Sequence, residues 1–399
     1  MDTVVVASPR VPNAEDLYID TPEALAALAS RLADAPWLAI DTEFLREKTY
    51  RARLCLIQLA APGIVACVDP LALPDIDALR PILCNKGITK ILHAAHQDLE
   101  ILYQLWGEIP MPVFDTQIAA ALLGQGEQIG YGRLVAEAID VTLDKGHART
   151  DWSQRPLDPA QIHYAADDVR YLGELYAQQH TALSARGRLS WLGDDFRRLG
   201  DPDTYTTDPE AVWHRLKGVH HLQGVQLSIA QSLAAWRERQ AQVADRPRRW
   251  ILADEPLIDI ARRPPASRDM LQRIRGLPDA VVGRHGDTLL RLVAEARERP
   301  ESEWPILADR LVLSPEQEAL ADLLMATLRL EARRQDIAPA MLATRRELEH
   351  LASGKTDLPV MQGWRAHVVG HTLRAVIEGQ LTVRMHDGQA SLMPTSDEG

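Results

Sequence analysis

The sequence predicts an α/β domain with a mixed sheet, followed by two all-α domains. Within the first 125 residues, short apolar segments alternate with amphipathic ones, which is typical of strands alternating with helices. Pro62-Gly63 separates two adjacent strand-like segments and indicates a hairpin, so the sheet is expected to be mixed rather than purely parallel. After residue 210 no strand pattern occurs until about residues 381–385, so this part is expected to be helical.

The α/β domain is expected to span residues 1–200. Its first helix, residues 23–34, follows Thr21, which suits the N-cap position. The apolar residues 37–40 then form a buried strand that runs into Asp-x-Glu. The elements expected after it are strands at 53–59 and 64–68, a helix at 76–83, a strand at 89–93, a helix at 97–106, a strand at 113–115, a helix at 116–123, helical structure past 130, and a long helix from Pro159 to about residue 180.

The helical half is expected to contain a tandem repeat of one small module. Residues 201–210 are rich in Asp, Thr and Pro and are interpreted as a linker. Residues 247–263 pair loosely with 338–354, each within a pattern of a long helix, a turn and shorter helices. The expected boundaries are 211–296 for the first helical domain, 297–385 for the second and 386–399 for a disordered tail.

Composition and charge limit the class of protein. The chain has 399 residues and three cysteines, none in a CxxC pair, so neither a zinc site nor a disulfide framework is expected. With no signal sequence and no membrane-length apolar run, a soluble cytoplasmic protein is expected. The net charge is −12, but residues 211–300 carry 16 Lys and Arg against 10 Asp and Glu. This segment is where a polyanion would bind, unless it is simply an Arg-rich solvated surface.

Asp41 and Glu43 form the first candidate site. Residues two apart on a strand point to the same face, so both carboxylates would project side by side from an apolar strand. Like charges this close repel each other, and burial adds to the cost. A hard divalent cation such as Mg²⁺ would relieve both problems, because it prefers oxygen ligands. The simpler alternative is a strand end that becomes polar as it reaches solvent.

Two further motifs could complete such a site. Asp98 lies in the first turn of a predicted helix that follows a strand, although an acidic residue there is also usual for a helix N-terminus. Tyr164 and Asp168 are four apart and share one face of the long helix, a common pattern that means little alone. A two-metal phosphoryl-transfer site needs about four carboxylates from separate elements, and these motifs supply that number.

Taken together, these motifs resemble the DEDD superfamily of 3′→5′ exonucleases in its tyrosine-containing branch and, more narrowly, the ribonuclease D family. The resemblance extends over residues 38–172. The stretches that carry it are residues 40–44 with Tyr50 and 57–59, residues 92–94 with 98–100, and residues 149–152 with 155–157 and 164–166.

The resemblance implies a ribonuclease H-like exonuclease domain followed by two HRDC-like domains. It implies that Asp41, Glu43 and Asp168 hold one divalent ion, Mg²⁺ or Mn²⁺, and that Asp41 and Asp98 hold a second. Tyr164 would orient the attacking water, and nucleoside 5′-monophosphates would be released from the 3′ end of RNA. The expected substrates are tRNA precursors and other structured RNAs, and a monomer is expected.

Substrate contacts are expected at two places. Thr42 and Phe44 flank Glu43 and could contact the terminal nucleotide, while the Arg-rich middle segment could grip phosphates through Arg246, Arg248 and Arg249. Trp236 and Trp250 accompany these arginines, and Trp250 is expected to pack in a core rather than to serve as a stacking platform. The alternatives are a DNA 3′→5′ exonuclease and a non-catalytic nucleic-acid-binding protein.

Overall fold

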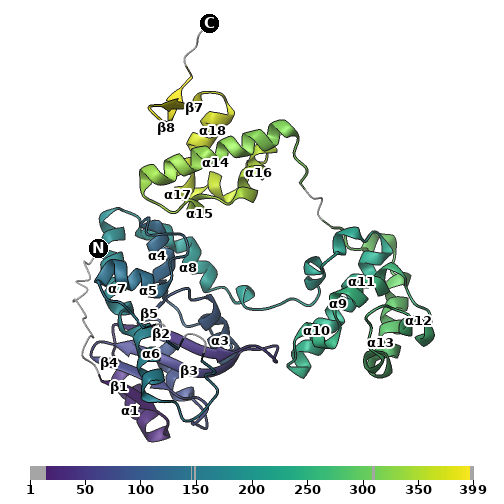
Figure 1. Cartoon of the computed structure of the whole chain (residues 1–399), viewed down its shortest axis with the longest axis horizontal. Coiled ribbons are helices and arrows are strands. Elements are labelled where there is room, and N and C mark those ends of the chain that lie inside the picture. Colours follow the sequence, from purple (N-terminus) through teal and green to yellow (C-terminus); the bar gives the residue numbers. More distant parts are fainter. Residues whose placement is uncertain (1–14, 145, 148–149, 308–310, 396–399) are drawn as a thin grey trace. The chain divides into compact units, whose positions relative to one another are not determined.

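The computed structural model describes residues 15–144, 146–147, 150–307 and 311–395 (Figure 1). The chain divides into two compact units. The sheet unit consists of Met1–Glu43, Cys55–Asp201 and Leu311–Gly399. The helical unit consists of Phe44–Leu54 and Pro202–Arg310.

A six-stranded mixed sheet organises the sheet unit, as the sequence predicts. Strands β3 and β4 form the expected antiparallel hairpin, whose turn contains Gly63 in the left-handed region. The pairs β1–β4, β2–β5 and β5–β6 are parallel. The strands, in their order across the sheet, are β1 (Asp16–Ile19), β4 (Ile64–Val68), β3 (Arg53–Ala61), β2 (Trp37–Leu45), β5 (Thr89–Leu92) and β6 (Val113–Asp115).

Helices cover this sheet, and one of them differs from expectation. The predicted helix from Pro159 to about residue 180 is interrupted at Tyr171. The Tyr131 hydroxyl donates to the Asp167 carbonyl and accepts from the Tyr171 amide, so it replaces one step of the helical ladder. The helices are α1 (Pro22–Leu32), α2 (Arg80–Leu83), α3 (His96–Trp106), α4 (Thr116–Leu122), α5 (Tyr131–Ile139), α6 (Pro159–Arg170), α7 (Leu172–Ala185) and α8 (Gly193–Leu199).

Two helical modules follow with the same order of elements, which supports the predicted repeat. Each long helix ends at an aspartate in the left-handed region, Asp245 or Asp336, and a four-residue helix and a short amphipathic helix come next. The helices of the first module are α9 (Val225–Ala244), α10 (Arg248–Ile251), α11 (Asp254–Arg262), α12 (Arg268–Gln272) and α13 (Asp279–Glu298). Those of the second are α14 (Pro315–Gln335), α15 (Pro339–Leu342), α16 (Arg345–Ala352), α17 (Gly363–Arg365) and α18 (His371–Ile377), with a π-helical turn at Ala366–Gly370 before α18.

The second module does not form a unit of its own, which differs from the predicted division at residues 297–385. Its α14 residues Leu324 and Leu328 share one buried core with Leu122 of α4 and Leu183 of α7. Arg188 donates to the main-chain oxygens of Leu122, Gln335 and Asp336, and the rings of Trp191 and Trp364 stack 4.5 Å apart.

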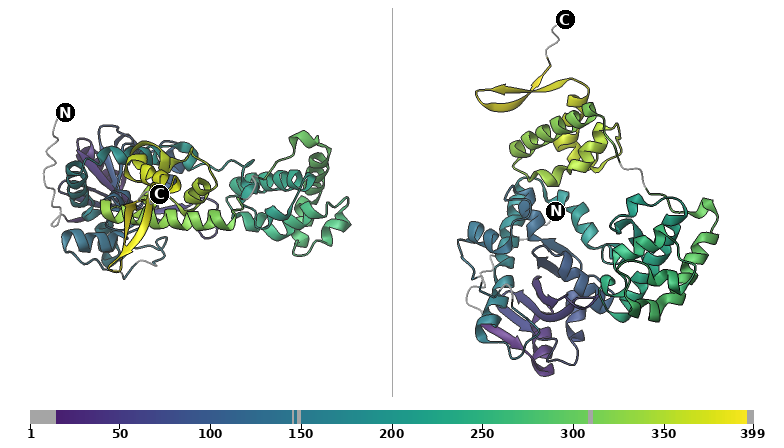
Figure 2. Two further views of the ribbon diagram at one scale, coloured as in Figure 1. Left: turned by 90° about the horizontal axis from the view of Figure 1, so that it is seen from above. Right: turned by 45° about the vertical axis from the view of Figure 1, so that its right-hand side comes forward.

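Two further predictions about the helical half are wrong. The tail expected to be disordered from residue 386 contains strand β8 (Gln389–Pro394), which pairs antiparallel with β7 (Leu381–His386), as the hairpin beyond α18 in Figure 2 shows. Trp250 is not a core residue, since 57% of its surface is exposed. No helix among the described residues has the length and apolar character needed to cross a membrane.

Candidate active site

Four carboxylates from three elements converge in the sheet unit. Asp41 and Glu43 lie on β2, which pairs in parallel with β5. The carboxyl ends of parallel neighbours lie at the same sheet edge, and α3 starts there with Asp98 in its first turn. Asp168 comes from α6, which packs against β1 and β4. We refer to Asp41, Glu43, Asp98 and Asp168 as the carboxylate cluster.

Burial shifts the pKa of every member of the carboxylate cluster upward, and the negative charges of nearby carboxylates add to the shift. Burial is the largest cause for all four. The negative charges of Asp98, Asp168 and Glu43 further raise the pKa of Asp41 well above its usual range. The pKa of Glu43 rises to about 8, with Asp168 and then Asp98 as the charged contributors, and the pKa values of Asp98 and Asp168 rise to about 7. The four groups are therefore near enough to oppose one another's ionisation.

Among the residues that the structure describes, no basic side chain is a main cause of the pKa shifts of these four carboxylates. Thr42 is the main uncharged partner of Asp98. Its hydroxyl donates to the Asp98 carboxylate over 2.5 Å, and this hydrogen bond favours the ionised form of Asp98. Within the described part of the chain, no three His, Cys, Asp or Glu side chains are already arranged to hold a metal ion. The donor set suits a hard divalent cation by chemistry and charge, and the side chains would have to move closer together to enclose one.

Tyr164 lies one helical turn before Asp168 on α6, and its ring packs against aromatic neighbours. The ring centroids of Tyr164 and Trp152 are 6.2 Å apart with the planes stacked at 27°, and His147 approaches Tyr164 edge-on at 5.8 Å. Burial first, and then the charges of Asp168 and Glu43, raise the pKa of Tyr164 to about 12. Its hydroxyl therefore stays protonated at neutral pH and can donate a hydrogen bond.

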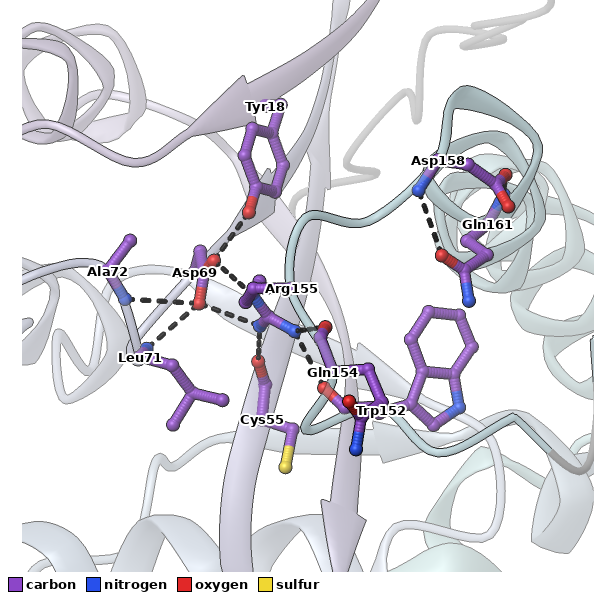
Figure 3. Close-up of polar contacts among 10 residues, drawn as sticks. All are labelled: Tyr18, Cys55, Asp69, Leu71, Ala72, Trp152, Gln154, Arg155, Asp158 and Gln161. Carbon is purple, nitrogen blue, oxygen red and sulfur yellow. Dashed lines mark hydrogen bonds and ion pairs between the residues drawn. The ribbon is translucent and has the colours of Figure 1, made fainter.

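Arg155 anchors the segment that carries Trp152 (Figure 3). Its guanidinium forms two bonds to the buried Asp69, 2.5 Å from Nε and 2.7 Å from Nη2, and also donates to the main-chain oxygens of Cys55 and Trp152. The Tyr18 hydroxyl donates to the same carboxylate. These contacts hold the pKa of Asp69 below its usual range even though burial opposes the shift.

Sequence reasoning missed part of this network. Arg155 belongs to a motif quoted for the family resemblance, but Asp69 and Tyr18 were not singled out. Asp69 follows the wholly apolar strand β4, as Asp41 follows an apolar run, and that pattern could have marked it as a buried charge that needs a partner. Arg149, from the same quoted motif, lies outside the described residues.

The expected substrate contacts fall in two places. Thr42 is buried and its hydroxyl is used by Asp98, whereas Phe44 is half-buried at the end of β2. In the helical unit, Arg246 and Arg249 are exposed, and Arg248 forms an ion pair with Glu238. Their role in binding stays a prediction.

Two family models match parts of this chain. The sequence model of a 3′-5′ exonuclease family matches residues 17–183, and the HRDC domain model matches residues 226–293. The first match contains the whole carboxylate cluster and Tyr164. The second lies within the first helical module, α9 to α13.

Relatives and a solved structure match nearly the whole chain. Ribonuclease D of Granulibacter bethesdensis is 38% identical over 94% of this chain and 95% of its own length, and that of Gluconacetobacter diazotrophicus is 39% identical over 95% and 97%. The crystal structure of Escherichia coli RNase D, described as an exoribonuclease involved in structured RNA processing, has 33% identity and a TM-score of 0.81, covering 91% of this chain and 99% of that one. The chain belongs to the ribonuclease D family and is a 3′→5′ exoribonuclease.

Proposed function

We propose that this enzyme removes nucleotides one at a time from RNA 3′ ends by hydrolysis with two divalent metal ions. The observation that carries the proposal is the carboxylate cluster: burial raises the pKa of all four acids, and the charges of the other members raise the pKa of Asp41 and Glu43 further. Within the described part of the chain, no basic side chain is among the main causes of these shifts. Such an arrangement is costly to a protein that does not use it, because each ionised group is both desolvated and repelled. A pair of cations would remove that cost.

The residues divide into two ligand sets. Asp41, Glu43 and Asp168 would hold one ion, and Asp41 with Asp98 would hold the other. When bound, the ions would activate a water and stabilise the oxygen that leaves from the penultimate nucleotide. Thr42 keeps the Asp98 carboxylate oriented through its short hydrogen bond. The ions would be Mg²⁺ or Mn²⁺, since both accept all-oxygen ligand sets.

Tyr164 would orient the attacking water. Its hydroxyl remains a donor and acceptor at neutral pH because the pKa is raised to about 12. Trp152 stacks on the Tyr164 ring and restricts its position, and Arg155 in turn holds the main-chain oxygen of Trp152 over 2.7 Å. Attack of the oriented water on the last phosphodiester releases a nucleoside 5′-monophosphate and leaves a 3′ hydroxyl on the shortened RNA.

The proposed substrates are tRNA precursors and other structured RNAs with a free 3′ end. Support comes from the relatives named ribonuclease D and from the description of the Escherichia coli structure, which refers to structured RNA processing. Thr42 and Phe44 would lie near the terminal nucleotide, and Arg246, Arg248 and Arg249 would contact phosphates further along the strand.

The test is product analysis on a 3′-labelled tRNA precursor, with and without EDTA. We expect labelled 5′-mononucleotides from the wild type with Mg²⁺ and none with EDTA or with Asp168→Asn. Asp194→Asn is the matched control, because Asp194 is exposed on α8 and pairs with Arg197. Equal or faster degradation of an all-DNA strand of the same sequence would contradict the RNA assignment. Release of nucleoside 3′-monophosphates would contradict the mechanism.

A further inference from the structure

A pocket of about 430 Å³ lies in the helical unit, within the size range of small-ligand sites. Its walls come from the segment that follows β2, from the turn Val212–Arg215 and from the first helical module. The lining side chains that matter here are Arg46, Thr49, Tyr50, Arg215, Arg248 and Arg249.

The charge of this pocket is strongly positive, although the whole chain is acidic. Arg237 and Asp254 also line it, but they form an ion pair with each other and contribute no net charge. Arg248 is paired with the fully buried carboxylate of Glu238. Among the residues that the structure describes, Arg215 and Arg249 have no hydrogen-bond or ion-pair partner, and both are exposed. Two guanidinium groups are therefore available to an anion.

The pocket wall is fixed before any ligand binds. The main-chain amides of Tyr50 and Arg51 both donate to the Asp245 carboxylate, over 3.1 and 2.9 Å. The Tyr50 hydroxyl donates to Glu238, and the guanidinium carbon of Arg248 lies 5.5 Å from the centre of the Tyr50 ring. Because these side chains are already ordered, they lose little conformational entropy when a ligand binds. The ligand therefore binds more tightly than it would to a flexible wall.

An exposed tryptophan follows Arg249 in the chain. Trp250 directly follows Arg249 in α10, and 57% of its surface is accessible. A large aromatic ring left in water next to unpaired arginines is typical of single-stranded nucleic-acid sites, where bases stack on the ring and phosphates meet the cations. Trp250 is not among the residues that line the pocket, so it would meet a base next to the bound phosphate rather than one inside the pocket.

We propose that this pocket binds one phosphodiester of a single-stranded RNA segment through Arg215 and Arg249, with Trp250 stacking on a neighbouring base. The proposal rests on the proposed function, because it takes RNA as the ligand. It adds Arg215 and Trp250 to the expected contacts, and it gives Arg248 the task of ordering Tyr50 and Glu238. Arg246 does not line the pocket.

The experiment measures binding of a fluorescent 12-nucleotide RNA by anisotropy in EDTA, over a series of salt concentrations. Arg215→Gln/Arg249→Gln should weaken binding at least about tenfold and reduce the slope of log affinity against log salt by about 0.7, since each neutralised phosphate on a single strand contributes about 0.7. Arg273→Gln/Arg275→Gln is the matched control, because it removes two exposed arginines of the same unit that lie outside the pocket. It should change affinity less than twofold.

Two substitutions of Trp250 test the proposed stacking contact. Trp250→Ala should weaken binding roughly tenfold with an unchanged salt slope, because it removes stacking and no charge. Trp250→Tyr should recover most of that loss. Competition with inorganic phosphate and with adenosine monophosphate separates an RNA site from a nucleotide site, since an RNA site should need millimolar concentrations of either competitor.

The outcomes separate this proposal from the proposed function. Wild-type RNA binding equal to that of the pocket variant, or losses of the same size in both arginine pairs, would overturn the pocket assignment. Displacement of RNA by micromolar adenosine monophosphate would overturn the choice of ligand. Because binding is measured without metal and without hydrolysis, an inactive wild type that still binds RNA through the pocket would contradict the proposed function and leave the pocket proposal standing.

Discussion

The sheet unit contains two clusters of buried and partly buried charged groups whose partners differ. In the carboxylate cluster, four acids face one another and all have raised pKa values. In the cluster around Asp69, one carboxylate faces Arg155 and Tyr18, and its pKa is lowered. Asp41 and Asp69 each follow a run of apolar strand residues, so burial acts on both carboxylates. The charge of the neighbouring groups decides whether the pKa is raised or lowered.

This difference is the one expected between the proposed catalytic site and a structural cluster. The Asp69 cluster is complete within the protein, because its charges and hydrogen-bonding groups find partners there, and its work is to hold the segment with Trp152 in place. The carboxylate cluster is incomplete without a cation. Like charges that lie close together repel one another, and a bound cation would remove that repulsion.

The largest expected effect comes from Asp41→Asn. Asp41 would belong to both ligand sets, so exonuclease activity should fall roughly a thousandfold or more, which corresponds to the several kcal/mol that a catalytic metal supplies. The free energy of unfolding in EDTA should be unchanged or rise by about 1 kcal/mol, because one source of repulsion is removed. Single-turnover kinetics and urea unfolding measure the two quantities. A variant that lost both activity and stability would contradict the comparison.

Asp69→Ala should mainly lower stability, in contrast to Asp41→Asn. It leaves the partly buried Arg155 and the Tyr18 hydroxyl without their carboxylate, so the free energy of unfolding should fall by about 3 kcal/mol. Urea unfolding followed by circular dichroism measures the loss. Asp77→Ala is a suitable control, because its carboxylate bonds to Trp106 at the surface and should contribute less than about 1 kcal/mol. Equal losses in the two variants would show that the Asp69 network is not structurally important.

Tyr164→Phe should have a smaller effect on rate. It keeps the stacked ring next to Trp152 and removes only the hydroxyl, so kcat should fall roughly 10- to 100-fold while KM for RNA stays within about twofold. Steady-state kinetics on a labelled RNA separates the two constants. Full kcat in this variant would show that the hydroxyl does not orient the water.

Stability in EDTA should also depend on pH. Glu43, Asp98 and Asp168 have folded-state pKa values of about 8, 7 and 7, above their unfolded values, so the folded protein binds more protons than the unfolded chain between about pH 4 and 8. Their contribution to stability is therefore greatest below pH 4 and is lost as pH rises to 8. The melting temperature should follow this trend, and Asp98→Asn should flatten it. An equal slope in wild type and variant would contradict the assigned pKa shifts.

Much of the fold could be predicted from the sequence because the core strands are short, apolar and bounded by clear turns. Strand β4 coincides with the predicted residues 64–68, and Thr21 is the N-cap of α1 as expected. Strand β1 was missed, because four residues with mixed polarity carry too weak a pattern. The predicted helix ending near residue 180 missed its break at Tyr171, because the Tyr131 hydroxyl that causes it is 40 residues away in sequence.

The carboxylate cluster could be predicted because its members lie at characteristic places, on one strand and in two helices, and in a familiar order. The Asp69–Arg155 pair could not, since 86 residues separate the partners and only the fold brings them together. The same holds for the module α14 to α18, whose apolar residues are shared with α4 and α7, and for the exposure of Trp250. Local pattern does not reveal which surface a helix covers.

The central claim is that the carboxylate cluster is an acid group completed by divalent cations. The most direct test counts the protons released per Mg²⁺ bound at pH 6.5, by calorimetry in buffers of different ionisation enthalpy. We expect proton release on binding, because Glu43, Asp98 and Asp168 have pKa values near or above this pH, and we expect Asp41→Asn to abolish it. Mg²⁺ binding without proton release, or equal release in wild type and Asp41→Asn, would contradict the account.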